Sequence, residues 1–364
     1  MGKRYLLFFL ISLALCSNAD TRATAQESNG RILVNVNLVQ LNVAVTDSKG
    51  RYVTGLNPQD FIITEDKIPQ KMATFEEGNG VTRDLMSEPS VAGNSLGQPD
   101  SAGTTQPVSG SPHSLSGAQS LSAQLNGANV FILFDTSNYM YRGFAYAQDS
   151  IADFVRSLEE AHKIAFYSYS RDLSRAATLT ADRDQVLRGV RSTVAGDDAA
   201  LYNCLLLTVK DTAHYTGRKV IVVFSNGPDN ASLVPPEDVA ELAQSTGTII
   251  YMISTQAARD EPVSTAVFER MSKATGGKAY FSKNWKDEAR AFASIRDDLA
   301  HLYTLTYYPA PNPNRGWRRI TVKLASKDQQ KYRIRTRDGY RLLQQAQLSS
   351  GLSAVSTPEP DPQE

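Results

Sequence analysis

The chain has 364 residues, which at about 150 residues per domain predicts two domains and some additional segments. Hydrophobic residues make up 41% of the sequence and charged residues 21%, as in ordinary globular proteins. Lys plus Arg and Asp plus Glu both number 38, so the chain lacks the basic excess that is typical of proteins binding nucleic acids or anionic membrane surfaces. We therefore expect no nucleic-acid partner.

The first 25 residues are predicted to be a secretory signal peptide. Basic residues Lys3 and Arg4 precede an apolar run, YLLFFLISLAL, that is too short to span a membrane as a mature helix. Short runs of small residues ending at Ala19 and Ala25 offer cleavage sites. An uncleaved anchor and a lipoprotein acylated at Cys16 are the alternatives. We expect an exported protein that is periplasmic, in the cell envelope or secreted, with no membrane span in its mature chain.

Residues 26–77 are predicted to form a small antiparallel β unit. Apolar and polar residues alternate between Val34 and Val45, which is the pattern of a half-buried strand. Shorter runs with strand character follow at 52–54, 61–64 and 71–75. Such a unit is too small to close a robust core by itself.

Residues 78–127 are predicted to be a disordered linker because they are rich in Ser, Gly and Gln and show little periodicity. From 128 to 301, strand-like runs alternate with amphipathic helical segments. The first of these strands, FILFD, ends at Asp135, and the apolar strand KVIVVFS ends at Ser225. This alternation predicts an α/β domain with a doubly wound, mainly parallel, Rossmann-like sheet that helices cover on both faces.

Residues 302–343 return to a period of two. The runs LYTLTYY, RITVKL and YRIRT are typical of antiparallel strands. Residues 344–364 are predicted to be a disordered tail. Because each flanking β segment is marginal alone, we expect the strands of 26–77 and 302–343 to pair into one small antiparallel β-sandwich, with the α/β domain inserted in it or flanked by it.

Several segments of the α/β region resemble the von Willebrand factor A (VWA) domain. They are FILFDTSNYM, DDAALYNCL, VIVVFSNGPDN and ATGGKAYF. The flanking segments VQLNVAVTDSKGRYVTGLNPQDFIITED and YTLTYYPAPNPNRGWRRITVKL resemble the bacterial VWFA-related proteins of Acidobacteria. The resemblance implies a binding module rather than an enzyme.

The resemblance also implies a metal-ion-dependent adhesion site at the carboxyl edge of the sheet, where Mg²⁺ accepts a carboxylate from a protein partner. The first loop of the family reads Asp-x-Ser-x-Ser; here Asp135 and Ser137 are kept, and Tyr139 replaces the second serine. Ala199 stands at the position of a threonine, and Asn226 replaces the aspartate of the third loop. We expect a degenerate metal site at Asp135, Ser137 and Asn226 that holds Mg²⁺ weakly or not at all.

Two adjacent carboxylates in the second loop, Asp197 and Asp198, could compensate for the lost metal ligands. Three aromatic residues, Tyr139, Tyr141 and Phe144, follow the first strand, and tyrosine is a common anchor of protein interfaces. We interpret them as a patch that binds a protein partner; packing of the loop on the next helix is the alternative.

The sequence carries no nucleophile elbow, phosphate-binding loop or histidine spacing that predicts catalysis. Cys204 lies among apolar helix residues and is interpreted as core. The leading hypothesis is therefore an exported, non-catalytic protein-binding module for adhesion or scaffolding. The alternatives are a working Mg²⁺-dependent adhesion module and an enzyme that uses the same sheet edge.

Overall fold

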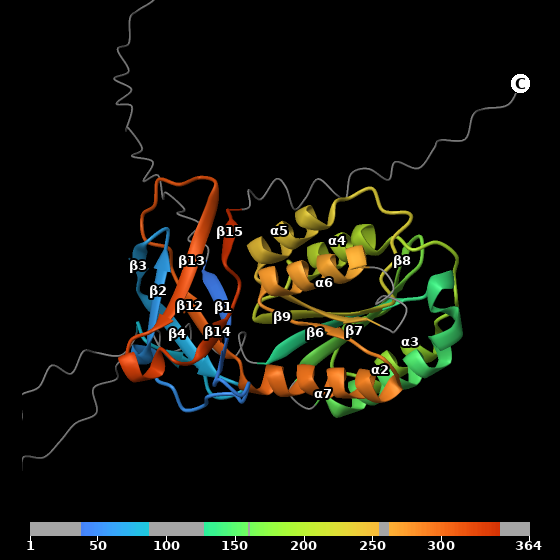
Figure 1. Cartoon of the computed structure of the whole chain (residues 1–364), viewed down its shortest axis with the longest axis horizontal. Coiled ribbons are helices and arrows are strands. Elements are labelled where there is room, and N and C mark those ends of the chain that lie inside the picture. The colour runs from blue at the N-terminus through green and yellow to red at the C-terminus, as the bar shows by residue number, and fades with distance from the viewer. Residues whose placement is uncertain (1–37, 87–126, 159–160, 255–261, 343–364) are drawn as a thin grey trace, which may run out of the picture. The chain divides into compact units, whose positions relative to one another are not determined.

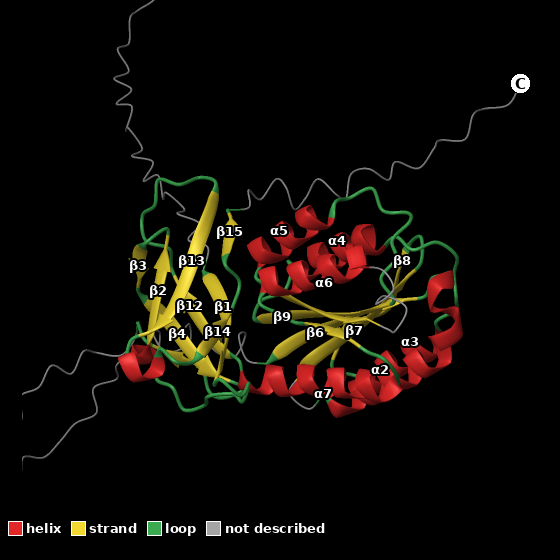
Figure 2. Cartoon of the chain, viewed as in Figure 1, coloured by secondary structure: helices red, strands yellow, loops and turns green. Residues whose placement is uncertain are grey.

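The computed structural model describes residues 38–86, 127–158, 161–254 and 262–342 (Figure 1). The predicted signal peptide with Cys16, most of the predicted linker and the predicted tail lie outside these residues. The described part of the chain contains one sheet covered by helices and two antiparallel sheets (Figure 2). This arrangement confirms the predicted fold class.

The sheet covered by helices has six strands in the order β11-β10-β9-β6-β7-β8, all parallel except β8. Their bounds are β6 Ala128–Asp135, β7 Ala161–Tyr169, β8 Leu173–Thr180, β9 Arg218–Ser225, β10 Thr248–Ser254 and β11 Ala279–Phe281. The chain runs outward from β6 to β7 on one side and from β9 to β10 on the other. The junction between β6 and β9 is therefore the topological switch point, where open α/β sheets bind ligands.

In the described part of the chain, six α-helices cover this sheet. Figure 2 shows helices on both of its faces. Their bounds are α2 Phe144–Ser157, α3 Arg183–Ser192, α4 Leu201–Thr212, α5 Pro236–Thr246, α6 Pro262–Thr275 and α7 Trp285–His301. Along β6, Ile132 and Phe134 pack in the core with α2, α3 and α7, whereas Phe131 and Leu133 pack with α4, α5 and α6. Successive strand residues point to opposite faces, so a strand buried on both faces must be apolar throughout.

The two antiparallel sheets share one hydrophobic core, as in a β-sandwich. One sheet has the order β14-β1-β12-β4-β5 and the other β15-β13-β2-β3. Their strands are β1 Val39–Thr46, β2 Phe61–Glu65, β3 Ile68–Gln70, β4 Met72–Glu77, β5 Arg83–Asp84, β12 Tyr303–Tyr307, β13 Trp317–Leu324, β14 Arg333–Arg335 and β15 Gly339–Arg341. Strands from before and after the α/β region alternate in both sheets, because β1 pairs with β12 and β14, and β13 pairs with β2.

Two local predictions were wrong. The strand predicted at 52–54 is reduced to a single bridge between Thr46 and Tyr52, because the chain turns away at Gly55, which has a φ of 75°. The predicted linker contains a short strand, β5, which pairs with β4.

At the other end of the α/β region, only Leu302 separates α7 from β12, a central strand of its sheet.

Buried arginines connect the α/β region to the sandwich. Arg218, the first residue of β9, donates hydrogen bonds to the carbonyl oxygens of Leu299 (2.8 Å) and Gly78 (2.6 Å) and to Thr304 Oγ1 (3.0 Å). Its guanidinium also lies 3.5 Å from a carboxylate oxygen of Glu76. The arginine thus satisfies backbone carbonyls that the junction would otherwise bury without partners.

A second connection joins α7 to β14. Arg335 contacts both carboxylate oxygens of Asp298, which is fully buried and also accepts hydrogen bonds from the hydroxyls of Tyr52 (2.6 Å) and Tyr251 (2.5 Å). Burial by itself would raise the pKa of Asp298, but Arg335 and Lys278 outweigh it and hold the pKa below its usual value. The carboxylate therefore stays ionised inside the protein and depends on its partners.

We expect Arg335→Ala to lower the free energy of unfolding by about 3 kcal/mol, because the buried Asp298 loses its closest cation and keeps only Lys278, at 3.6 Å. Urea unfolding at neutral pH measures this. The matched control is Arg290→Ala, which removes the exposed ion pair with Asp287 and should cost about 1 kcal/mol or less.

The Arg335→Ala difference should also depend on pH. Because folding lowers the pKa of Asp298, its stabilisation is present above its unfolded pKa, about 3.9, and is lost as the pH falls through the folded value. The difference in the free energy of unfolding between wild type and Arg335→Ala should therefore become smaller below about pH 4. Equal losses in the two arginine variants would contradict the assigned role of this pair.

Candidate functional site

The carboxyl ends of β6, β7 and β9 meet in a buried hydrogen-bonded cluster. Asp135 at the end of β6 accepts hydrogen bonds from the backbone N–H of Ser137 (2.9 Å) and from Ser225 Oγ (2.8 Å). Ser225 Oγ in turn accepts from the Tyr169 hydroxyl (3.2 Å) and from the Gly227 N–H (3.1 Å). The Asp135 carboxylate is therefore fixed at the switch point by groups from three neighbouring strands.

The charge of Asp135 is unfavourable in this position. Burial raises the pKa of the carboxyl group, while hydrogen bonds from Ser137 and Ser225 act against this rise. No cation within the described ranges forms an ion pair with Asp135.

Two further oxygens of this cluster are buried without a partner. Ser137 Oγ and Asn226 Oδ1 make no hydrogen bond to any described residue, and Asn226 is only 2% exposed. The orientation of the Asn226 amide is fixed, because its nitrogen donates to the backbone oxygen of Tyr139. Buried oxygens without partners are uncommon in folded proteins.

The three predicted metal residues therefore lie together, and their atoms can be tested against Mg²⁺. Asp135, Ser137 and Asn226 offer one carboxylate, one hydroxyl and one amide oxygen, whereas Mg²⁺ requires six oxygen ligands and usually keeps several waters. In the part of the chain that the structure describes, no cluster of three or more His, Cys, Asp or Glu side chains is arranged to hold a metal. The residues fit a hydrated ion that has few protein ligands.

The second loop does not replace the missing ligands. Ala199 is buried and is held through its N–H, which donates to Asn230 Oδ1 (2.8 Å). The Asp198 carboxylate contacts Asn230 (3.3 Å) and lies 3.9 Å from Arg171. Asp197 contributes its backbone oxygen, which accepts from the N–H of Asn138 (2.8 Å), and its side chain is exposed. The second loop is thus joined to the first and third loops by hydrogen bonds.

The third loop caps α4, which was not predicted. The helix begins after Ala200, whose side chain cannot cap it, so Asp229 accepts from the N–H of Tyr202 (3.0 Å) and Ser232 from that of Asn203 (3.0 Å). These are ordinary N-cap residue types supplied from another segment. The sequence carried one signal of this arrangement. Residue types that commonly cap helices occur together in the run PDNAS, although no helix starts directly after it.

Exposed tyrosines surround this edge. Tyr139 is 44% exposed and Tyr141 is 75% exposed, both in a 3-10 helix, η2, over Asn138–Gly143. Phe144, predicted as part of the same patch, is partly buried instead, and its ring centroid lies 5.4 Å from that of Phe134. Tyr146, which the sequence did not single out, is 70% exposed in the first turn of α2.

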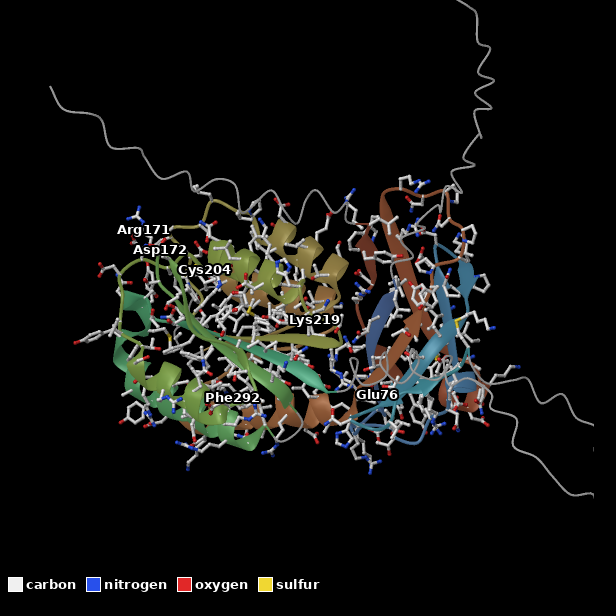
Figure 3. All side chains as sticks on the ribbon, turned by 180° about the vertical axis from the view of Figure 1, so that it is seen from behind. Glu76, Arg171, Asp172, Cys204, Lys219 and Phe292 are labelled. Atoms are coloured by element: carbon white, nitrogen blue, oxygen red, sulfur yellow. The ribbon has the colours of Figure 1, made fainter. Side chains whose placement is uncertain are left out.

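A polar cavity of about 330 Å³ lies beside the first loop. Its lining includes hydroxyl groups of Thr136, Ser168 and Ser170 and the carboxylate of Asp172. Figure 3 labels Asp172 and Cys204 at this end of the α/β region. Cys204 is buried, and burial raises the pKa of its thiol to about 12, so it is not a reactive nucleophile.

The comparison with protein families identifies the α/β region. Residues 129–295 match the sequence model of the von Willebrand factor type A domain, which confirms the resemblance of the α/β region. An aerotolerance-related membrane protein from Bacteroides fragilis is 15% identical, with 47% of this chain and 99% of that chain covered and a TM-score of 0.39. No curated protein matches the chain.

Two other solved structures are similar at comparable levels. The vWF domain of the type V pili tip protein Mfa5 from Porphyromonas gingivalis is 13% identical, covering 47% of this chain and 94% of that chain, with a TM-score of 0.41. A von Willebrand factor type A protein from Catenulispora acidiphila is 13% identical, covering 63% and 69%, also with a TM-score of 0.41.

We expect Asp135→Asn to raise the free energy of unfolding at pH 7, because burial raises the pKa of this carboxyl group and its ionisation at pH 7 therefore costs the wild type stability. An acid with a raised pKa favours the fold below its unfolded pKa, and this contribution is lost as the pH rises through the folded value. The gain should therefore vanish near pH 4, at about the unfolded pKa. Urea unfolding at both pH values measures it.

The control for this change is Asp197→Asn, in the neighbouring loop, whose exposed carboxylate should leave stability within about 0.5 kcal/mol. A lower free energy of unfolding for Asp135→Asn at pH 7 would contradict this prediction, because it would mean that the ionised carboxylate stabilises the fold.

Proposed function

Because residues 129–295 form a VWA domain, we propose that the protein is an exported, non-catalytic module that binds a protein partner through the carboxyl edge of this domain, for adhesion or as a scaffold. One observation supports this most: two tyrosine side chains are exposed on the first loop at that edge, whereas Asp135 and Ser137, which a metal would need, are buried. Tyr139 and Tyr141 are 44% and 75% exposed, and Asp135 and Ser137 are fully buried. A partner that approaches this edge meets the tyrosines first.

The chemistry of the exposed residues suits a protein partner. Tyrosine presents an apolar ring and a polar hydroxyl at low cost in conformational freedom, and it is enriched among the residues that dominate binding energy. Phe144 begins α2 directly after η2 and packs on Phe134, so it anchors the end of the segment that carries the tyrosines.

Export is the second part of the proposal. It rests on the basic and apolar residues from Lys3 to Leu15 and on the small residues that follow them. None of the helices in the described part of the chain has the length and hydropathy of a membrane-spanning segment.

The metal site is proposed to be degenerate, so that binding does not need Mg²⁺. In the family such an ion would accept a carboxylate from the partner. Here Asp135 supplies the one carboxylate, Ala199 has no side-chain oxygen, and Asn226 is occupied on one side by the backbone of Tyr139. The free oxygens of Ser137 and Asn226 favour the second candidate, a Mg²⁺-dependent adhesion module.

Replacing both tyrosines by serine, Tyr139→Ser and Tyr141→Ser, should reduce capture of the partner from a native cell-envelope extract by about tenfold or more, since one hot-spot tyrosine contributes about 2 kcal/mol. The control is Tyr308→Ser in the sandwich, where a tyrosine of similar exposure, 41%, is removed. Equal capture by wild type and the double variant would overturn the proposed binding surface.

Binding should persist in EDTA, and titration with Mg²⁺ or Mn²⁺ should give no saturable signal below about 1 mM, because most metal ligands of the family are missing. Isothermal titration calorimetry of wild type and Asp135→Ala tests this. Saturable binding in the millimolar range or tighter, lost in Asp135→Ala and retained in Asp197→Ala, would establish the Mg²⁺-dependent alternative.

A further inference from the structure

An apolar groove lies on the face opposite to α2 and α7, away from the buried carboxylate cluster. It has a volume of about 340 Å³ and is bounded by α5, α6 and the first residue of β13. Its apolar lining consists of Pro236, Ala240, Val267, Met271, Ala274 and Trp317. The volume is at the lower end of the range for ligand sites, about 300–1,000 Å³, and such sites favour junctions between packed units.

Trp317 is a fixed wall of this groove. A Cβ atom at Gly339 would lie 2.6 Å from Cε2 and Nε1 of the indole and 2.6 Å from the backbone oxygen of Arg318. Only glycine allows the ring to lie this close to β15. The indole therefore packs against the backbone of β15 and forms one wall of the groove.

The charges at the rim of the groove are already compensated. Glu237 pairs with Arg270 at 3.4 Å, and Glu241 pairs with Arg341. Between these pairs the lining is apolar. The groove therefore fits an uncharged, apolar occupant better than an ion, because a charged group would lose its hydration without gaining a free counter-charge.

The chain itself passes along the rim of the groove. In the antiparallel pair of β13 and β15, Trp317 lies directly opposite Arg341, whose backbone N–H donates to Ser245 Oγ of α5 (3.0 Å). The described residues end at Leu342, immediately after this contact. Whatever follows Leu342 therefore starts beside Trp317.

The sequence that follows matches the groove in chemistry. Residues 343–358 contain no charged side chain and carry four large apolar residues among Gln, Ser, Gly and Ala. These apolar residues are Leu343, Leu348, Leu352 and Val355. A segment tethered this closely has an effective concentration in the millimolar range, so even a weak apolar contact would be populated.

We propose that the groove between α5, α6 and Trp317 is the docking site for the chain's own segment 343–358. This inference is independent of the tyrosine surface at the carboxyl edge.

The fluorescence of Trp317 tests the proposal. The chain has two tryptophans, so Trp285→Phe leaves Trp317 alone. In this background, ending the chain after Leu342 should raise the acrylamide quenching constant about twofold and shift the emission to the red, since the indole loses an apolar cover. Adding a synthetic peptide of residues 343–358 should reverse both changes in a saturable manner.

A peptide carrying Leu348→Ser and Leu352→Ser should not reverse the rise in the quenching constant or the red shift of the emission. In the truncated chain, Ala240→Glu in the groove should weaken binding of the wild-type peptide at least about tenfold, since it buries a charge without a partner. Ala266→Glu, on the exposed side of α6, should leave it unchanged and controls for effects on folding.

Three results would overturn the proposal. The first is that truncation leaves quenching unchanged. The second is that the serine-substituted peptide acts as well as the wild-type peptide. The third is that the quenching of the full-length chain depends on protein concentration and sedimentation reveals a dimer, which would assign the groove to a second copy of the chain.

Discussion

The burial of arginine guanidinium groups at the junction between the sandwich and the VWA domain is the constraint on which the architecture depends. Arg218 enters the junction from the sheet of the α/β region, and Arg335 enters it from the sandwich. An ionised guanidinium is stable inside a protein only when its hydrogen bonds are nearly all satisfied. Backbone carbonyls and the Asp298 carboxylate supply bonds to the terminal nitrogens, although Nε of Arg218 is buried without a described partner. Separating the two parts would therefore leave further charged groups unpaired.

The carboxyl edge of the sheet also buries a charged group, but without an ion pair among the described residues. There a single carboxylate, Asp135, is buried without a cation, and the loops around it are held by hydrogen bonds to one another. Asn226 donates a hydrogen bond to the backbone oxygen of Tyr139 and so holds the first loop. The loops at this edge are therefore stabilised by hydrogen bonds to one another.

Features that repeat along the chain could be predicted from the sequence. Strand β6 is apolar on both faces and the helices are amphipathic, so the parallel sheet and its two helical layers follow from periodicity. The place of Asp135 and Asn226 follows as well, because the ends of parallel strands meet at one edge.

Features that depend on distant pairs could not be predicted in this way. Arg335 stands in an alternating strand and is typical of a solvated position, yet its partner on α7 is far away in the sequence. The caps of α4 come from a loop beyond the next strand, and the inward direction of Phe144 depends on the neighbouring Phe134. Such contacts are set by tertiary packing, which local sequence patterns do not record.

The direct passage from α7 into β12 has a mechanical consequence. With only Leu302 between them, a force on the helix passes directly to the strand. Strand β12 is hydrogen-bonded on both sides, to β1 and to β4, so two ladders hold it in the sandwich. A partner held at the proposed surface of the VWA domain would therefore load the sandwich through a strand that is paired along both edges.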